Sequence, residues 1–172
     1  MKKIICILLL LLAISSMYYF SSQDGVTSSQ QSQIVVKIID KIRDKVTLKD
    51  ERLITIKDKI YNELKAYDKQ YIIRKAAHFL IYASIGVFMM LVLYLFSKKI
   101  SLSANIAFIL TILYAIYDEN RQLSINGRSG NIIDVFIDSS GALLAIATLS
   151  IILATGKGIG FIFNLNKKTD ED

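Results

Sequence analysis

The stretch 118–138 concentrates the charged side chains that could do chemistry in this chain. It reads DENRQLSINGRSGNIIDVFID and holds four carboxylates and two guanidiniums between two long apolar segments. A connection between two membrane helices needs only a few polar residues, with Gly or Asn to reverse the chain. Asn126–Gly127 and Gly130–Asn131 supply that turn chemistry. The additional charges therefore indicate a function at this end of the helices.

Three kinds of chemistry fit these residue types. Carboxylates could hold a hard divalent cation, Arg and Lys could bind phosphate or carboxylate, and His78 or Glu119 could act as a general acid or base. A structural alternative is a set of buried ion pairs that hold helices together. With one His and one Cys in the chain, a zinc site of the usual type is not expected. Spacing does not choose among the rest, so we assign no metal ligand and leave the cofactor unknown.

Four apolar blocks must position these side chains, and they cover residues 4–20, 76–96, 102–117 and 135–152. At about 1.5 Å per residue the longest spans roughly 31 Å and the shortest roughly 24 Å. These lengths are close to the hydrocarbon thickness of a bilayer, about 30 Å. We therefore predict an all-α, integral membrane four-helix bundle that forms a single domain over residues 1–172.

The segment 21–75 is predicted to be an extracytoplasmic, amphipathic helical loop. Residues 21–32 have the composition of a polar connector, and the apolar residues within 34–46 and 53–64 follow a helical period. Two amphipathic helices of this kind typically pack on each other or lie on the membrane surface; a partner-binding cap is the alternative. The role of the basic part, 36–70, stays open.

The first apolar block could be a cleaved signal peptide, since Ala13 and Ser15 suit a cleavage site. The apolar run continues to Phe20, however, and its aromatic end is typical of a retained anchor, which we favour. The positive-inside rule then predicts a multi-pass protein of the cell membrane with both termini in the cytoplasm. The basic residues that this places in the cytoplasm are Lys2, Lys3, Lys98, Lys99, Lys157, Lys167 and Lys168.

This topology brings distant residues together at the outer face of the membrane. Arg74, His78 and Tyr82 are spaced by four and share one helical face, while Asp134, Asp138 and Gly141 share another. Gly141 would allow a neighbouring helix to approach closely. Arg74, Lys75 and His78 then lie in the same leaflet as the stretch 118–138, which predicts a polar pocket at this end of the bundle.

Three segments resemble the VanZ-like membrane proteins: 20–32 (FSSQDGVTSSQQS), 74–86 (RKAAHFLIYASIG) and 117–145, which begins YDENRQ. The family pattern has R/K–K–x–x–H–F entering one helix, then D–E–x–x–Q, G–R, and D–x–x–x–D/N–x–x–G entering the last helix. Asn120–Arg121 departs from the apolar or small residues more common there, so the resemblance implies no role for Arg121. The matching positions are Arg74, Lys75, His78, Phe79, Tyr82, Asp118, Glu119, Gln122, Gly127, Arg128, Asp134, Asp138 and Gly141.

The resemblance implies a cell-envelope protein, because the family namesake is associated with low-level resistance to the antibiotic teicoplanin in Gram-positive bacteria. Its implied partners are the lipid bilayer and an anionic lipid or cell-wall precursor, not nucleic acid. The alternatives are a membrane enzyme acting on a lipid-linked phosphate and a non-enzymatic accessory or permease subunit, so catalysis stays open. We hypothesise catalytic roles for Glu119, His78 and Asp134, and substrate-binding roles for Arg74, Lys75, Tyr82, Asp118, Gln122, Arg128 and Asp138.

Overall fold

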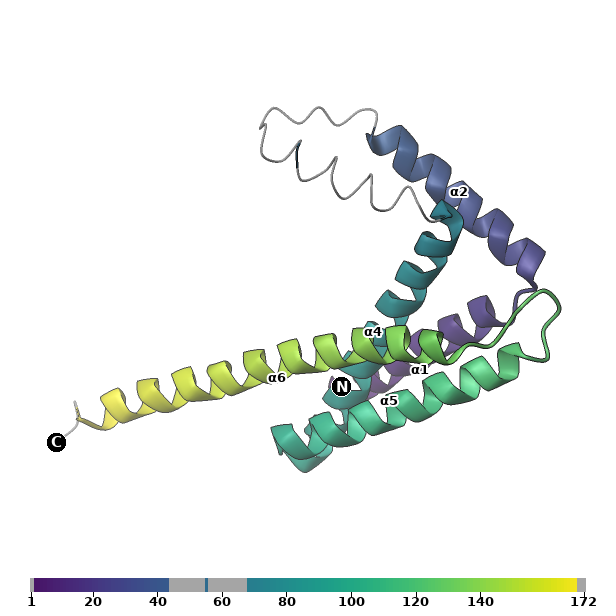
Figure 1. The fold of residues 1–172 in the computed structure, drawn as a ribbon. Coiled ribbons are helices and arrows are strands. Elements are labelled where there is room, and N and C mark those ends of the chain that lie inside the picture. The colour runs from purple at the N-terminus through teal and green to yellow at the C-terminus, as the bar shows by residue number, and fades with distance from the viewer. Residues whose placement is uncertain (1, 44–54, 56–67, 170–172) are drawn as a thin grey trace.

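The computed structural model of the protein describes residues 2–43, 55 and 68–169, and these residues form helices without strands (Figure 1). Four helices are long and apolar enough to cross a membrane, with candidate spans at Lys3–Ser21, Lys69–Ser97, Ile100–Gln122 and Ile132–Gly156. The predicted all-α, four-span architecture is confirmed. The helices are α1 (Lys2–Ser21), α2 (Gly25–Arg43), α4 (Lys69–Ser97), α5 (Ile100–Gln122) and α6 (Ile132–Thr169).

α4 is longer than its apolar block and begins several residues earlier than predicted. The Asp68 side chain caps its first turn by accepting a hydrogen bond from the Gln70 backbone N–H at 3.1 Å. Its end is set by Lys98, which adopts a left-handed conformation with φ of 58°. At 29 residues the helix is about 43 Å long. This length exceeds a hydrocarbon core of about 30 Å, and Arg74 and Lys75 lie in the first two turns of the helix.

Two predicted boundaries are wrong, and both errors concern polar residues that turn out to be helical. α5 continues past residue 117 to Gln122, so Asp118 and Glu119 project from its last turns rather than from a loop. The connection between α5 and α6 is 123–131, with Gly127 at φ of 70°. Residues 25–32 are not a connector but the start of α2, because Asp24 caps the helix by accepting from the Thr27 backbone N–H at 2.7 Å. The second predicted amphipathic helix, 53–64, falls outside the described residues except for Thr55.

α4 is the central helix, because it packs against α1, α2, α5 and α6. The core around it contains the fully buried side chains of Met17, Tyr82, Ile85 and Met90. Gly141 lies so close to α4 that an added Cβ would be 2.4 Å from the Phe79 carbonyl oxygen. The predicted close approach at Gly141 is therefore present, and it fixes how the first half of α6 lies on α4.

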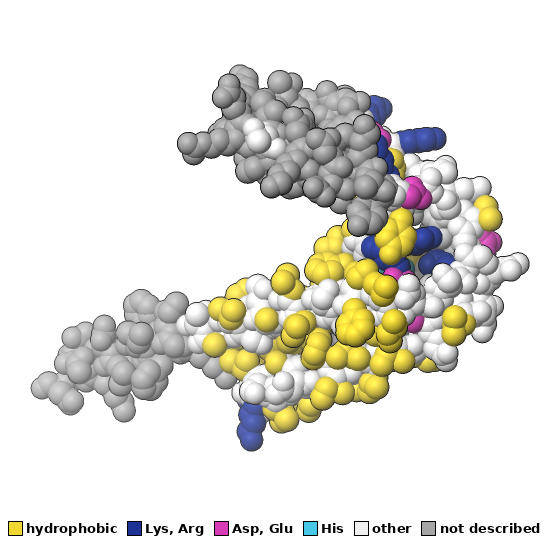
Figure 2. All heavy atoms as spheres, in the orientation of Figure 1, with side chains coloured by type: hydrophobic (Ala, Val, Ile, Leu, Met, Phe, Trp, Pro, Cys, Tyr) yellow, Lys and Arg dark blue, Asp and Glu magenta, His cyan; other side chains and the backbone are white. Residues whose placement is uncertain are grey.

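On the face of the bundle seen in Figure 2 the sides of the helices are largely apolar, and most of the charged side chains gather at one end. Large exposed side chains such as Leu12, Leu113 and Leu144 cover the sides of the helices, as expected for contact with lipid. At the other end, the Lys3 ammonium lies 4.3 Å from the Phe96 ring centroid. The start of α1 and the end of α4 therefore share one end of the bundle, opposite the stretch 118–138.

Candidate functional site

The carboxylates of the stretch 118–138 are buried inside the bundle. Asp118 and Asp138 are 1% exposed, Glu119 is 4% exposed and Asp134 is 7% exposed. An ionised group in a membrane span costs a few kcal/mol unless a partner compensates it. The question for each carboxylate is therefore which group offsets its charge.

Asp118 is fully satisfied by three donors. Its carboxylate accepts from Ser21 Oγ at 2.7 Å, from Gln122 Nε2 at 3.1 Å and from Arg121 Nη2 at 3.0 Å. The Arg121 guanidinium also lies 4.2 Å from the ring centroid of Tyr18. Arg121, for which the family pattern implies no role, thus joins α5 to the end of α1.

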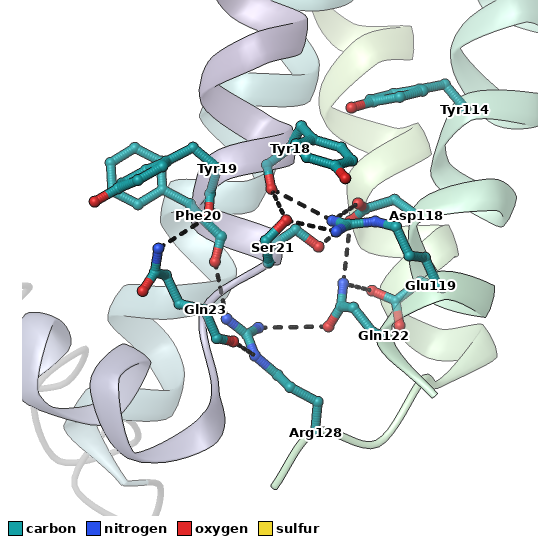
Figure 3. A network of polar contacts seen from close by, with 12 residues as sticks. Tyr18, Tyr19, Phe20, Ser21, Gln23, Tyr114, Asp118, Glu119, Gln122 and Arg128 are labelled. Carbon is teal, nitrogen blue, oxygen red and sulfur yellow. Dashed lines mark hydrogen bonds and ion pairs between the residues drawn. The ribbon is translucent and has the colours of Figure 1, made fainter. Parts of the chain in front are cut away.

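Arg128 extends from the 123–131 connection to the junction of α1 and α2 (Figure 3). It donates to the backbone oxygens of Phe20 at 3.0 Å and Gln23 at 3.1 Å, and to Gln122 Oε1 at 3.4 Å. All three acceptors are neutral. Burial lowers the pKa of Arg128 below its usual value, and repulsion by Arg74 acts in the same direction. The guanidinium stays protonated, and among the described residues it forms no ion pair with a carboxylate, although Asp118 and Glu119 attract it from a greater distance.

The start of α4 supplies two more cations with different surroundings. Lys75 forms an ion pair with Asp134 of α6, and its ammonium lies 5.1 Å from the Tyr71 ring centroid. Arg74 has no hydrogen bond or ion pair within the described part of the chain. Lys75 is therefore neutralised, whereas Arg74 and Arg128 are not.

Behind these residues lies a buried cluster from three helices: His78 of α4, Glu119 of α5 and Asp138 of α6. His78 Nδ1 is 3.7 Å from Asp138 Oδ2, which is too long for a hydrogen bond. Glu119 accepts from Gln122 Nε2 and from the Asn131 backbone N–H, each at 3.0 Å. Hydrogen bonds therefore fix the position of Glu119, whereas no hydrogen bond joins His78 to Asp138.

Two adjoining pockets open at this end of the bundle. The polar pocket has a volume of about 110 Å³ and is lined by Tyr71, Arg74, Lys75, His78, Gln122, Gly127, Arg128, Ser129, Asn131 and Asp134. The apolar pocket, about 210 Å³, lies between α2 and α4 and is lined by Phe20, Ser28, Gln31, Ser32, Val35, Ile73, Arg74, Ala77, His78, Ile81 and Arg128. Arg74, His78 and Arg128 belong to both, so the pockets meet along these three side chains.

The structure divides the predicted site residues into two groups. Those that line the polar pocket are Arg74, Lys75, His78, Gln122, Arg128 and Asp134. Glu119, Asp118 and Asp138 lie behind the pocket wall, and Tyr82 is fully buried in the core.

Sequence analysis did not predict that α2 lines the apolar pocket. Val35, which lines this pocket, belongs to the apolar stripe predicted for 34–46. The stripe predicted an amphipathic helix but did not show that this helix packs against α4.

A family model described as VanZ/LLP1 matches residues 6–153. The match covers most of the chain and includes every predicted site residue. The chain belongs to the VanZ/LLP1 family. No curated protein and no solved structure matches it. The function of this VanZ/LLP1 member is therefore inferred from its family membership and from the geometry of the polar end of the bundle, where the stretch 118–138 lies.

Proposed function

We propose that this VanZ-like envelope protein binds an anionic membrane amphiphile at the polar pocket, either a phosphate-bearing lipid or a lipid-linked cell-wall precursor. By doing so it lowers sensitivity to teicoplanin. In this proposal the pocket faces the outside of the cell membrane and both termini are cytoplasmic. The observation that carries the proposal is the pair of guanidiniums, Arg74 and Arg128, that meet no carboxylate and lie where a polar and an apolar pocket join.

The chemistry of the two pockets matches the two parts of such a ligand. Guanidinium groups bind phosphate through paired, charge-assisted hydrogen bonds. Ile73, Ala77 and Ile81 on α4, facing Val35 on α2, line the neighbouring pocket with apolar surface suited to a hydrocarbon chain. A free phosphate would use only the first pocket, and a neutral lipid only the second.

A second candidate function is catalysis on a lipid-linked phosphate. The observation that favours it is the position of His78, which lines both pockets and also lies 3.7 Å from a buried carboxylate oxygen of Asp138. An imidazole in this place is suited to proton transfer to or from a bound phosphate ester. Turnover that is lost with His78→Gln, while binding is kept, would distinguish an enzyme from a binder.

Binding can be tested with the purified full chain in detergent micelles. The probes are a polyprenyl phosphate, the corresponding polyprenol and inorganic phosphate, followed by intrinsic Tyr fluorescence or native mass spectrometry. We expect the phosphate ester to bind tightest. Replacing Arg74 by Gln should weaken its binding about 10- to 100-fold, because a hydrogen bond to a charged group contributes about 1.5–3 kcal/mol.

The matched control is Lys99→Gln, which removes one positive charge at the opposite end of the bundle and should leave the affinity unchanged. Equal weakening by both variants would mean that net charge, not the pocket, attracts the ligand. In a sensitive Gram-positive host at equal membrane levels, wild type but not Arg74→Gln should protect against teicoplanin more than against vancomycin. Protection that survives the substitution would refute the link between pocket and resistance.

A further inference from the structure

The buried cluster behind the polar pocket has the composition and spacing of a metal site. His78, Glu119 and Asp138 each offer one ligand atom, and these atoms lie within 4.8 Å of one another. The three residues come from α4, α5 and α6 and are 6%, 4% and 1% exposed. A site made from three different helices is fixed by the packing of the bundle rather than by a flexible loop.

Around this cluster the buried carboxylates outnumber the Lys and Arg side chains that pair with them. Of the four buried carboxylates, Asp118 pairs with Arg121 and Asp134 pairs with Lys75. Glu119 and Asp138 have no Lys or Arg partner in the part of the chain that the structure describes, and the hydrogen bonds to Glu119 come from neutral groups. Two carboxylates therefore share one region of low dielectric, where Asp134 repels both of them and Lys75 attracts Glu119 without forming an ion pair with it. A divalent cation would offset both charges at once.

Two atoms of the cluster are buried without a hydrogen-bond partner among the described residues. They are His78 Nδ1 and Asp138 Oδ2, and they face each other at 3.7 Å. Two ligands that each lie about 2.1 Å from a tetrahedral metal ion are about 3.4 Å apart. The observed separation is thus near the value that coordination of a common ion requires. Because all three ligand atoms lie within 4.8 Å of one another, Glu119 needs to come closer to the other two by no more than about 1.4 Å.

We propose that His78, Glu119 and Asp138 bind one divalent transition-metal ion, such as Mn²⁺ or Zn²⁺. One imidazole nitrogen with two carboxylate oxygens is an intermediate ligand set that suits these ions better than Ca²⁺ or Cu⁺. Three protein ligands leave at least one coordination position open. The metal site does not depend on the proposed function, because its evidence is the buried cluster and not the guanidiniums of the polar pocket.

The test uses the full chain, purified with a histidine-free affinity handle and stripped with EDTA, and Mn²⁺ as the probe. His78 is the only histidine in the sequence. Electron spin-echo modulation of bound Mn²⁺ therefore reports this one residue, and we expect coupling to a single imidazole nitrogen at one ion per chain. Mn²⁺ should also raise the melting temperature of the stripped protein.

The variants to compare are Asp138→Asn, within the cluster, and Asp24→Asn, which changes an aspartate that precedes α2 and contacts no member of the cluster. Asp138→Asn should weaken Mn²⁺ binding by more than about 100-fold, because the loss of outer partners of a metal ligand alone costs 10- to 100-fold. Asp24→Asn should bind as wild type does. The proposal is wrong if the folded wild type binds no stoichiometric Mn²⁺, if bound Mn²⁺ shows no nitrogen coupling, or if Asp138→Asn retains wild-type affinity. Should Asp138→Asn fail to fold, the nitrogen coupling of the wild type decides alone.

Discussion

Replacing Gly141 by Ala should destabilise the protein, although Ala favours helices more than Gly does. An added Cβ would lie 2.4 Å from the Phe79 carbonyl oxygen and 3.1 Å from two atoms of the Phe79 ring. An ordinary carbon–oxygen contact is about 3.4 Å. The carbonyl belongs to the backbone of α4 and cannot rotate away, so α4 and α6 must separate by about 1 Å where they are closest.

The size of the effect follows from two opposing contributions. Overpacking of a well-packed contact costs about 1–3 kcal/mol, and removing a Gly from a helix interior gains about 0.5–1 kcal/mol. The expected net loss is about 1–2 kcal/mol. Since Phe79 follows His78 and Gly141 lies one turn after Asp138, the same separation should also weaken Mn²⁺ binding to the proposed metal site.

Gly156→Ala is the matched control for this prediction. Gly156 is also in α6, but an added Cβ there would meet no atom within 4 Å. That variant should gain about 0.5–1 kcal/mol. The assay is reversible unfolding in mixed SDS and nonionic detergent, followed by circular dichroism. If Gly141→Ala were as stable as wild type or more stable, the close approach of α4 and α6 would be wrong.

Two further predictions concern the contacts that hold α1 and α2. Arg121→Met should destabilise the protein by about 3 kcal/mol in the same unfolding assay, because it leaves the buried Asp118 without its ion-pair partner; an unchanged stability would show that the pair contributes nothing. Hydrogen bonds from the Thr27 backbone and side chain lower the pKa of Asp24 below 3.8. This cap therefore contributes stability above that pH and loses it as pH falls through the lower, folded value. Amide exchange at Thr27 should be faster in Asp24→Ala than in wild type at neutral pH, with the difference closing in acid; a difference that stayed constant would contradict the cap.

The four spans and the location of the site could be predicted because they depend on long apolar segments and alternating basic ends. Such segments are long and apolar enough to cross a membrane. Consecutive spans run in opposite directions, so their order alone predicts that Arg74 and His78 lie at the end that holds Asp134. The predicted helix boundaries were wrong where polar side chains form their hydrogen bonds within a helix. Ser32 donates to the Ser28 backbone oxygen, for example, so a serine-rich segment that resembles a connector is stable as the first half of α2.

The pairing of charges could not be predicted, because it depends on how each helix is rotated about its axis. The sequence offers four carboxylates and several cations but no rule for matching them. Only the packing of α4 on α6 assigns Lys75 to Asp134, and only the contact of α5 with α1 gives Arg121 a role. What remains after this matching is the group His78, Glu119 and Asp138, which sequence analysis had divided between catalysis and substrate binding.

The contacts between the end of α1 and the polar end of the bundle join residues that are made at very different times. Ser21 and Asp118 are 97 positions apart, and Phe20 and Arg128 are 108 positions apart. At about 5–20 residues per second, about 5–20 s pass between the synthesis of α1 and the synthesis of the end of α5 and the following connection. During that interval Ser21 and the carbonyl groups that Arg128 later binds have no partner from this region. The polar end is therefore completed late in synthesis, and a nascent chain stalled before residue 118 contains α1 but none of the four carboxylates of the stretch 118–138.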